Sequence, residues 1–174
     1  LYVFDIMASP ISGGAIIVYA RKTTIKENAR VKTYRAIELR KKVNTLEKWK
    51  GFAEKSYAHR DALAGVLREV SQRGNCIVGY GASARSSTLL NFCGLDGKII
   101  KSIADQSHLK HKLFTAGTHI KIDSPEKVMV LKPNLVVILG WNFADEIIGI
   151  LKKKLHYKGR ILVPLPNKPV IKEI

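Results

Sequence analysis

Acidic residues, cysteines and long apolar runs are all scarce in this sequence of 174 residues. No apolar run approaches the ~18 to 20 residues that span a bilayer, and the first residues lack the features of a signal peptide. We therefore expect a cytoplasmic protein with no membrane partner. Two cysteines, Cys76 and Cys93, are too few for a structural zinc site, so we expect reduced thiols and no metal. The content of 46% hydrophobic and 25% charged residues is typical of a folded globular protein.

The shortage of acidic residues leaves a formal net charge of +16, from 30 Lys and Arg against 14 Asp and Glu. Such a charge attracts polyanions, including nucleic acid, lipid headgroups and nucleotide phosphates, but it does not choose among them. The basic residues are spread along the chain without the aromatic stacking pattern of single-strand binders, which argues against nucleic acid as a partner. A solvated basic surface with no partner is the alternative interpretation.

The stretch CIVGYGASARSSTLLNFCG, from Cys76 to Gly94, predicts a strand, a tight turn and a helix. We expect Gly79 to take a backbone conformation closed to other residues, and Gly81 to let an anion approach the main chain because it has no Cβ. The helix that follows offers free amides and the positive end of its dipole to a phosphate. The expected binding residues in this turn are Gly79, Gly81, Ala82, Ser83, Ala84 and Arg85. An ordinary buried strand with a glycine turn is the alternative.

Two apolar segments at the start of the chain predict a pair of strands. Val3 to Ile6 is the first, and Ala15 to Ala20 is the second, which we expect to be mostly buried. Two strands need a larger sheet to cover them. We therefore interpret residues 1–24 as the tail of an upstream domain.

A long polar and basic stretch without proline follows, from about Glu27 to Gln72. Its apolar residues recur at helical spacing, which predicts one long helix or two consecutive helices with a kink or boundary at Gly51. Gly74 suits a C-terminal cap, and His59 is expected at the surface. Residues 25–73 are thus a predicted helical connector.

Strands and helices alternate in the rest of the sequence. The predicted strands after the glycine turn are Ile99–Ala104, Ile120–Ile122, Leu135–Leu139 and Arg160–Val163, and the predicted helices begin at Ser124 and Ala144. The order β-α-β-β-α-β-α-β with short connections favours a Rossmann-like α/β fold, a three-layer and mostly parallel sheet over residues 74–174.

Polar and aromatic residues follow two of these strands at the carboxyl edge of the predicted sheet. Asp105 ends the second strand, about twenty positions after the glycine turn, where dinucleotide-binding folds hold a ribose hydroxyl. A helix N-cap or a turn-forming role is the alternative for this residue. Trp141 and Asn142 follow the most hydrophobic strand, at the edge where open α/β sheets bind ligands.

The stretch from Gly79 to Pro166 closely resembles the C-terminal domain of the S-adenosylmethionine-dependent C-methyltransferases that act on nucleotide-linked deoxysugars. The matching segments are GYGASAR, TLLNFCG, AGTHI, SPE, WNFADEI and PLP, together with Asp105. The resemblance implies a longer transferase with a zinc domain, a central domain that binds S-adenosylmethionine, and this Rossmann-like domain, which helps to hold a nucleotide-diphosphate sugar. S-adenosylmethionine is then expected on the upstream domain, not on this chain, which we expect to be inactive alone.

Within this resemblance, Thr118, His119, Trp141, Asn142 and Glu146 are expected to join the glycine turn around the substrate. One position departs from the family, which usually has a histidine directly before the Gly-Gly pair, where this sequence has Ser12. That histidine is thought to act as a base, and a serine cannot take a proton at neutral pH without an activating partner. The catalytic residues therefore stay unassigned. A non-catalytic nucleotide- or dinucleotide-binding module is the alternative function, and a basic module for RNA or membranes is a third.

Overall fold

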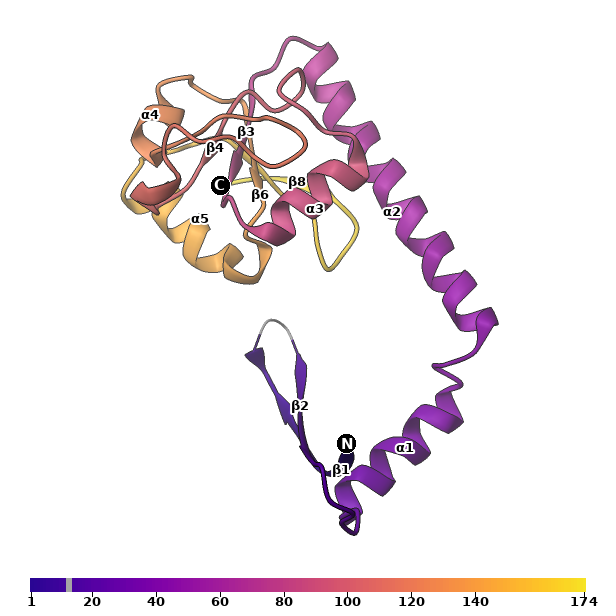
Figure 1. Ribbon diagram of the computed structural model, residues 1–174. Helices are drawn as coiled ribbons and strands as arrows, with labels where there is room; N and C mark the ends of the chain where they lie inside the picture. Colours follow the sequence, from indigo (N-terminus) through magenta and orange to yellow (C-terminus); the bar gives the residue numbers. More distant parts are fainter. Residues whose placement is uncertain (12–13) are drawn as a thin grey trace. The chain divides into compact units, whose positions relative to one another are not determined.

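The computed structural model describes residues 1–11 and 14–174 (Figure 1). The chain forms two compact units, Leu1–Ser56 and Tyr57–Ile174. The boundary between them lies inside helix α2 (Leu46–Gln72), between the limits at residues 24 and 73 that the sequence suggests. No helix in the described residues combines the length and the apolar character needed to cross a membrane.

The first unit contains a two-stranded antiparallel sheet of β1 (Tyr2–Ser9) and β2 (Ala15–Arg21). The strand pair is confirmed, but every residue of β2 is exposed. The expectation of a mostly buried second strand is therefore wrong for this chain. Within the described residues β1 is the only strand that pairs with β2, and the apolar side chains of β2 are partly exposed, Ile16 at 51% and Val18 at 54%.

Helix α1 (Ala29–Lys41) is joined to β1 by polar contacts of Asp5. The Asp5 carboxylate accepts hydrogen bonds from Asn28, the N-cap of α1, and from Arg30, whose Nε lies 2.9 Å from Asp5 Oδ1. The Arg30 hydrogen bond, helped by that of Asn28, lowers the pKa of Asp5 below its usual value. This carboxylate therefore fixes the start of α1 against the strand pair.

The long helical stretch is two helices, and the break between them is not at Gly51. Lys42 takes the left-handed conformation, with φ 51°, and its amide reaches back to the carbonyls of Glu38 and Leu39. This closes α1 in the way that left-handed caps close helices. Helix α2 then runs unbroken through Gly51, so the predicted boundary there is wrong. The predicted cap at Gly74 is confirmed, with φ +77° two residues after the end of α2 and its amide donating to Ser71 O at 3.0 Å.

The second unit is built on a six-stranded sheet. Its strands are β3 (Ile77–Tyr80), β4 (Ile103–Ala104), β5 (Ile122–Asp123), β6 (Leu135–Ile138), β7 (Arg160–Val163) and β8 (Val170–Glu173). The spatial order is β5-β4-β3-β6-β7-β8, and every pair is parallel except β7 with β8. The expected mostly parallel sheet is confirmed. Strand β8 is absent from the sequence-based prediction.

Helices cover both faces of this sheet (Figure 1). Along β3 the side chains alternate, so that Ile77 packs with α2 and α3 (Ala84–Cys93) on one face. Val78 and Tyr80 pack on the other face with α4 (Pro125–Met129) and α5 (Ala144–Lys153). Burial on both faces explains why the strand predicted at Leu135–Leu139 is the most hydrophobic of the sequence.

His59 differs from its expected surface position. Its residue is only partly exposed, and its Nε2 is buried without a hydrogen-bond partner in the described part of the chain. The side chain lies one helical turn before Leu63, which is in the core. Because residues four apart lie on the same side of a helix, His59 lies at the border of the buried face of α2.

Candidate functional site

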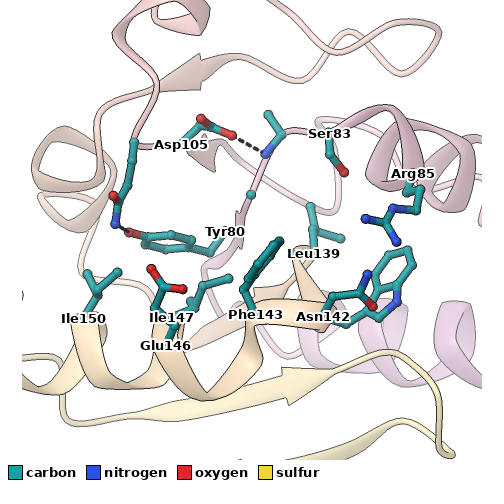
Figure 2. A pocket seen from close by; sticks show the side chains of 15 residues that line it. Tyr80, Ser83, Arg85, Asp105, Leu139, Asn142, Phe143, Glu146, Ile147 and Ile150 are labelled. Atoms are coloured by element: carbon teal, nitrogen blue, oxygen red, sulfur yellow. Dashed lines mark hydrogen bonds between the residues drawn. The ribbon is translucent and has the colours of Figure 1, made fainter. Parts of the chain in front are cut away.

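A pocket of about 330 Å³ lies at the carboxyl ends of β3 and β6 (Figure 2). These two parallel strands are neighbours, and the strand order runs outward from them in opposite directions. Helix-covered parallel sheets bind ligands outside the strand ends at such a point. The pocket walls come from the β3–α3 turn, from the residues after β4, and from η3 (Trp141–Phe143) and α5.

The two glycines of the β3–α3 turn have different roles from those expected. Gly79 lies within β3, and a Cβ there would be 2.7 Å from Leu139 Cδ1, so its lack of a side chain makes room for the core. Gly81 is the residue in the left-handed region, with φ +99°, and a Cβ there would be 2.9 Å from Gly140 N. The special conformation predicted for Gly79 is therefore found at Gly81. The close neighbour of Gly81 is the chain leaving β6.

Asp105 supports the glycine turn from the end of β4. Its Oδ2 accepts a hydrogen bond from Ala82 N at 2.7 Å and contacts Lys110 Nζ at 3.1 Å, while Oδ1 accepts from Ser107 N at 2.9 Å. Lys110 Nζ also donates to Ala82 O at 2.7 Å. The carboxylate thus has the contacts of a turn-forming residue. Because it accepts the hydrogen bond of Ala82 N, that amide is not free to bind a phosphate as expected.

The first turn of α3 still presents two free amides. Ser83 and Ser86 form a reciprocal cap, with Ser86 N donating to Ser83 Oγ at 3.2 Å and Ser83 N donating to Ser86 Oγ at 2.7 Å. Within the described residues, no protein acceptor pairs with the amides of Ala84 and Arg85. Free amides at the positive end of a helix dipole attract anions. The expected anion site is thereby narrowed to Ala84 and Arg85.

The Arg85 side chain lies at the same end of the pocket as Asn142 (Figure 2). It is exposed, and none of the described carboxylates lies within ion-pairing distance of it. A guanidinium in this setting can bind a phosphate through two hydrogen bonds. Arg85, Asn142 and the α3 amides therefore form a polar, positively charged end.

The other end of the pocket is mainly apolar and was not predicted from the sequence. It is lined by Tyr80, Phe143, Ile147 and Ile150. Phe143, Ile147 and Ile150 recur at spacings of four and three residues, so the helical period of α5 was a signal for this wall. A flat apolar ligand group would gain contact area here.

Tyr80 adds a polar group to the apolar end. Its hydroxyl accepts a hydrogen bond from Gln106 Nε2 at 3.4 Å. Burial is the main reason that the pKa of Tyr80 lies above its usual value, and nearby carboxylates, Glu146 among them, act in the same direction. The phenol therefore stays protonated at neutral pH and can donate a hydrogen bond into the pocket.

Comparison with known proteins places the chain in a family. Residues 10–166 match the family model described as the C-methyltransferase C-terminal domain. The chain belongs to this family. It is 32% identical over 173 residues to C-methyltransferase NovU of Streptomyces niveus, an alignment that covers 98% of this chain and 41% of that protein. The resemblance inferred from the sequence is confirmed, and the chain spans less than half the length of this relative.

In this C-methyltransferase C-terminal domain, the pocket gathers most of the residues that the sequence singled out. Those that line it are Gly81, Ala82, Ser83, Arg85, Asp105, Trp141, Asn142 and Glu146. Gly79 and Ala84 adjoin the lining residues without belonging to it. The lining residues that the sequence did not single out as ligand contacts are Tyr80, Gln106, Leu139, Gly140, Phe143, Ile147 and Ile150.

Thr118 and His119 do not line the pocket of this C-methyltransferase C-terminal domain. The Thr118 hydroxyl forms a hydrogen bond of 2.7 Å with that of Thr115, and His119 takes φ 52° in the same turn. Their local contacts are those of a loop between Thr115 and Ile120. Ser12, the residue at the family's usual histidine position, lies outside the described residues.

Proposed function

We propose that this chain is the substrate-binding part of an S-adenosylmethionine-dependent C-methyltransferase and that its pocket holds a nucleotide-diphosphate sugar. The observation that carries the proposal is the two-ended pocket, with Arg85 and two free helix amides at one end and an apolar wall at the other. A nucleotide diphosphate has matching parts, a charged diphosphate and a flat base. Family membership supports the methyltransferase class.

The proposed fold of the second unit is Rossmann-like. The order of its strands along the sheet, counted from the first strand of the unit, is 3-2-1-4-5-6, which is the order of dinucleotide-binding folds. The glycine turn and α3 then stand where such folds bind a phosphate. This correspondence supports a nucleotide ligand over a ligand without phosphate.

In the proposed reaction, this chain positions the substrate and does not carry the methyl donor. S-adenosylmethionine would supply the methyl group from a domain upstream of this chain, as the greater length of the relative allows. Arg85 and the α3 amides would neutralise the diphosphate charge and fix the sugar at the entrance of the pocket. Because positioning alone transfers no methyl group, the chain alone is expected to bind nucleotide and to be inactive.

Calorimetric titration of the chain with dTDP, UDP, NAD and S-adenosylmethionine tests this function. We expect saturable binding of the two diphosphates, weakened about tenfold or more by Arg85→Ala because a charge-assisted hydrogen bond is lost. Arg73→Ala is the matched control, since Arg73 is exposed, pairs with Glu69 and does not line the pocket. S-adenosylmethionine should not bind.

Other outcomes of this titration favour other functions. Binding of NAD without either diphosphate would support a dinucleotide-binding module, the second candidate, which the GxGxxA turn and the strand order favour. Absence of all nucleotide binding would contradict the proposed role of the pocket.

A further inference from the structure

Lys110, in the loop after β4, was not singled out from the sequence as a site residue. It ends the short helix η2 (His108–Lys110), and its side chain reaches back to the glycine turn. Its Nζ donates to the carbonyl of Ala82 at 2.7 Å and lies 3.1 Å from Asp105 Oδ2. The side chain is 41% exposed and does not line the pocket. Lys110 therefore contacts the turn and not the space for a ligand.

The two peptide groups on either side of Ala82 are both held by hydrogen bonds. The first contains the Ala82 amide, which donates to Asp105 Oδ2 at 2.7 Å. The second contains the Ala82 carbonyl, which accepts from Lys110, and the Ser83 amide, which donates at its other end to a serine hydroxyl at 2.7 Å. Ala82 is buried, and a buried carbonyl needs a donor. Within the described residues, Lys110 is the donor that this carbonyl has.

These two peptide groups lead into the first turn of α3, which presents the free amides of Ala84 and Arg85. Glycine at position 81 leaves the chain before them with many accessible backbone conformations. The contacts that fix the peptide groups after Gly81 therefore determine where the free amides point. Donors that are already oriented bind an anion more tightly, because the turn loses less conformational entropy on binding.

The Lys110 main chain is itself held at both of its polar groups. Its amide donates to Ser107 O at 3.0 Å, and its carbonyl accepts from Leu113 N at 3.1 Å. In the next residue, His111 Nε2 lies 2.8 Å from the carbonyl oxygen of Asp105, within hydrogen-bonding distance. The loop is thus closed on itself, and the lysine side chain reaches the turn from a fixed position.

We propose that Lys110 is a positioning residue for anion binding. By bridging the Ala82 carbonyl and the Asp105 carboxylate, it holds the glycine turn so that the free amides of α3 point at the diphosphate. This inference rests on the proposed nucleotide-binding function. The pair of Lys110 and Asp105 has no net charge, so its effect on an anion comes mainly from geometry and not from attraction.

Titration of UDP into Lys110→Met tests this role. Methionine has a similar length but no donor, so the UDP affinity should fall about tenfold, the effect of one lost hydrogen bond to a charged group. Because the lysine side chain is partly exposed, the variant should fold. Lys110→Arg should retain most of the affinity, since a guanidinium can donate to the same carbonyl and carboxylate.

Lys121→Met is the matched control. Lys121 Nζ lies 3.3 Å from Oδ2 of Asp123, at the end of the neighbouring strand β5, and the Asp123 and Asp105 side chains are equally buried. This second lysine–aspartate pair does not line the pocket or contact the glycine turn. The substitution removes the same charge, so the UDP affinity of Lys121→Met should equal that of the wild type.

A double variant separates geometry from charge. Lys110→Met leaves the Asp105 carboxylate without its cation, and an unpaired carboxylate near the turn repels an anion. Lys110→Met with Asp105→Asn removes both charges and keeps the net charge of the wild type. If the pair acted by charge alone, this double variant would bind UDP as tightly as the wild type. The proposal predicts that it binds no more tightly than Lys110→Met, because the Ala82 carbonyl still lacks its donor.

Amide NMR gives a readout that a general loss of stability would not change. At saturating UDP, the shifts of the Ala84 and Arg85 amides should be smaller in Lys110→Met than in the wild type, because the turn no longer orients these amides. Lys121→Met should show the wild-type shifts.

The outcomes distinguish this inference from the proposed function. If the wild-type chain binds UDP and Lys110→Met binds it equally well, or if the double variant recovers the full affinity, the positioning role of Lys110 is wrong and the proposed function stands. If the wild-type chain does not bind UDP, the proposed function is contradicted and the inference fails with it.

Discussion

At Gly81 the backbone has φ +99°, and the space where a side chain would begin is filled by the backbone of Gly140. Gly81→Ala should therefore cost about 1–3 kcal/mol of unfolding free energy, because alanine is strained in this conformation and the chain after β6 must move. Urea unfolding measures the cost, and the same variant should lose nucleotide affinity.

Gly65→Ala is the control for that substitution. Gly65 lies inside α2, and a Cβ there would meet nothing within 4 Å. The same change of one methyl group should there raise the unfolding free energy by about 0.5–1 kcal/mol, because glycine is a poor helix former. Equal effects of the two substitutions would refute the structural account of Gly81.

Tyr157 should contribute to the unfolding free energy at neutral pH, and this contribution should be lost in alkaline solution. Its hydroxyl donates to Arg160 O at 2.8 Å, and burial raises the pKa of Tyr157 to about 12, compared with about 10 in an unfolded chain. A group with a raised pKa contributes stability that is complete below the unfolded pKa and lost as the pH rises through the folded pKa. The unfolding free energy of wild type minus that of Tyr157→Phe should thus fall between about pH 10 and 12. A difference that stays constant across this range would contradict the prediction.

The sequence alone could locate the pocket residues of the glycine turn, but it could not assign the structural role of each one. The glycine turn at positions 79 and 81 was predictable from the sequence. Which of the two glycines has a positive φ depends on the residue at which β3 ends, and sequence patterns do not fix a strand boundary to one residue. Asp105 was found by its place after a strand. Its contacts with Ala82 and Lys110 depend on loops that the sequence does not position.

Periodic patterns in the sequence predicted the long helices and strands well and the short strands poorly. Strand β6 and helix α5 were expected from apolar runs and were found. Strands β4 and β5 are two residues each, shorter than expected, and the length of such short strands is not set by their own sequence pattern. The edge strand β8 was missed because its VIKE sequence has a weak alternating pattern.

The break between α1 and α2 occurs at a residue that the sequence does not mark as a helix end. Glycine is the usual residue in a left-handed cap, and Gly51 was therefore the expected break. The structure uses Lys42 instead, with Thr45 as the next capping hydroxyl, which accepts from Lys48 N at 3.4 Å. A cap on a lysine leaves no pattern in the sequence.

His59 offers a test of packing at the level of α2. Its buried Nε2 has no partner in the described residues, and an unpaired buried polar atom destabilises the folded state. His59→Leu should raise the unfolding free energy by about 1 kcal/mol. His108→Leu, at an exposed site, should change it little. A destabilised His59→Leu protein would show that the nitrogen has a partner in solution.

For the whole molecule, the charge of +16 raises the question of which anions bind to the surface and which to the pocket. Binding to a diffuse basic surface should fall steeply with salt and should not depend on Arg85. Pocket binding of UDP involves few charges, so the logarithm of its affinity should fall with the logarithm of salt concentration with a slope of about one to two. Titrating UDP and single-stranded RNA into wild type and Arg85→Ala at several salt concentrations separates the two modes. If the UDP affinity is the same in wild type and Arg85→Ala and falls with salt concentration as steeply as the RNA affinity, UDP binds to the basic surface and not in the pocket.

The family assignment could be predicted from short segments in a fixed order along the chain, and two of them, GYGASAR and WNFADEI, supply pocket residues. The apolar half of the pocket could not, since Tyr80, Phe143 and Ile150 look like ordinary core residues in the sequence. Their exposure to the pocket results from how α5 lies on the sheet.

The measurement that tests the central claim most directly is an amide NMR titration of the chain with UDP. The account predicts saturable shifts of the amides of Ala84 and Arg85 and of the Trp141 indole, which are absent in Arg85→Ala. It also predicts that the amides of α1, outside the unit that holds the pocket, do not respond. Shifts spread over the lysine-rich surface, with no saturable change at Ala84 and Arg85, would contradict a nucleotide site in this pocket.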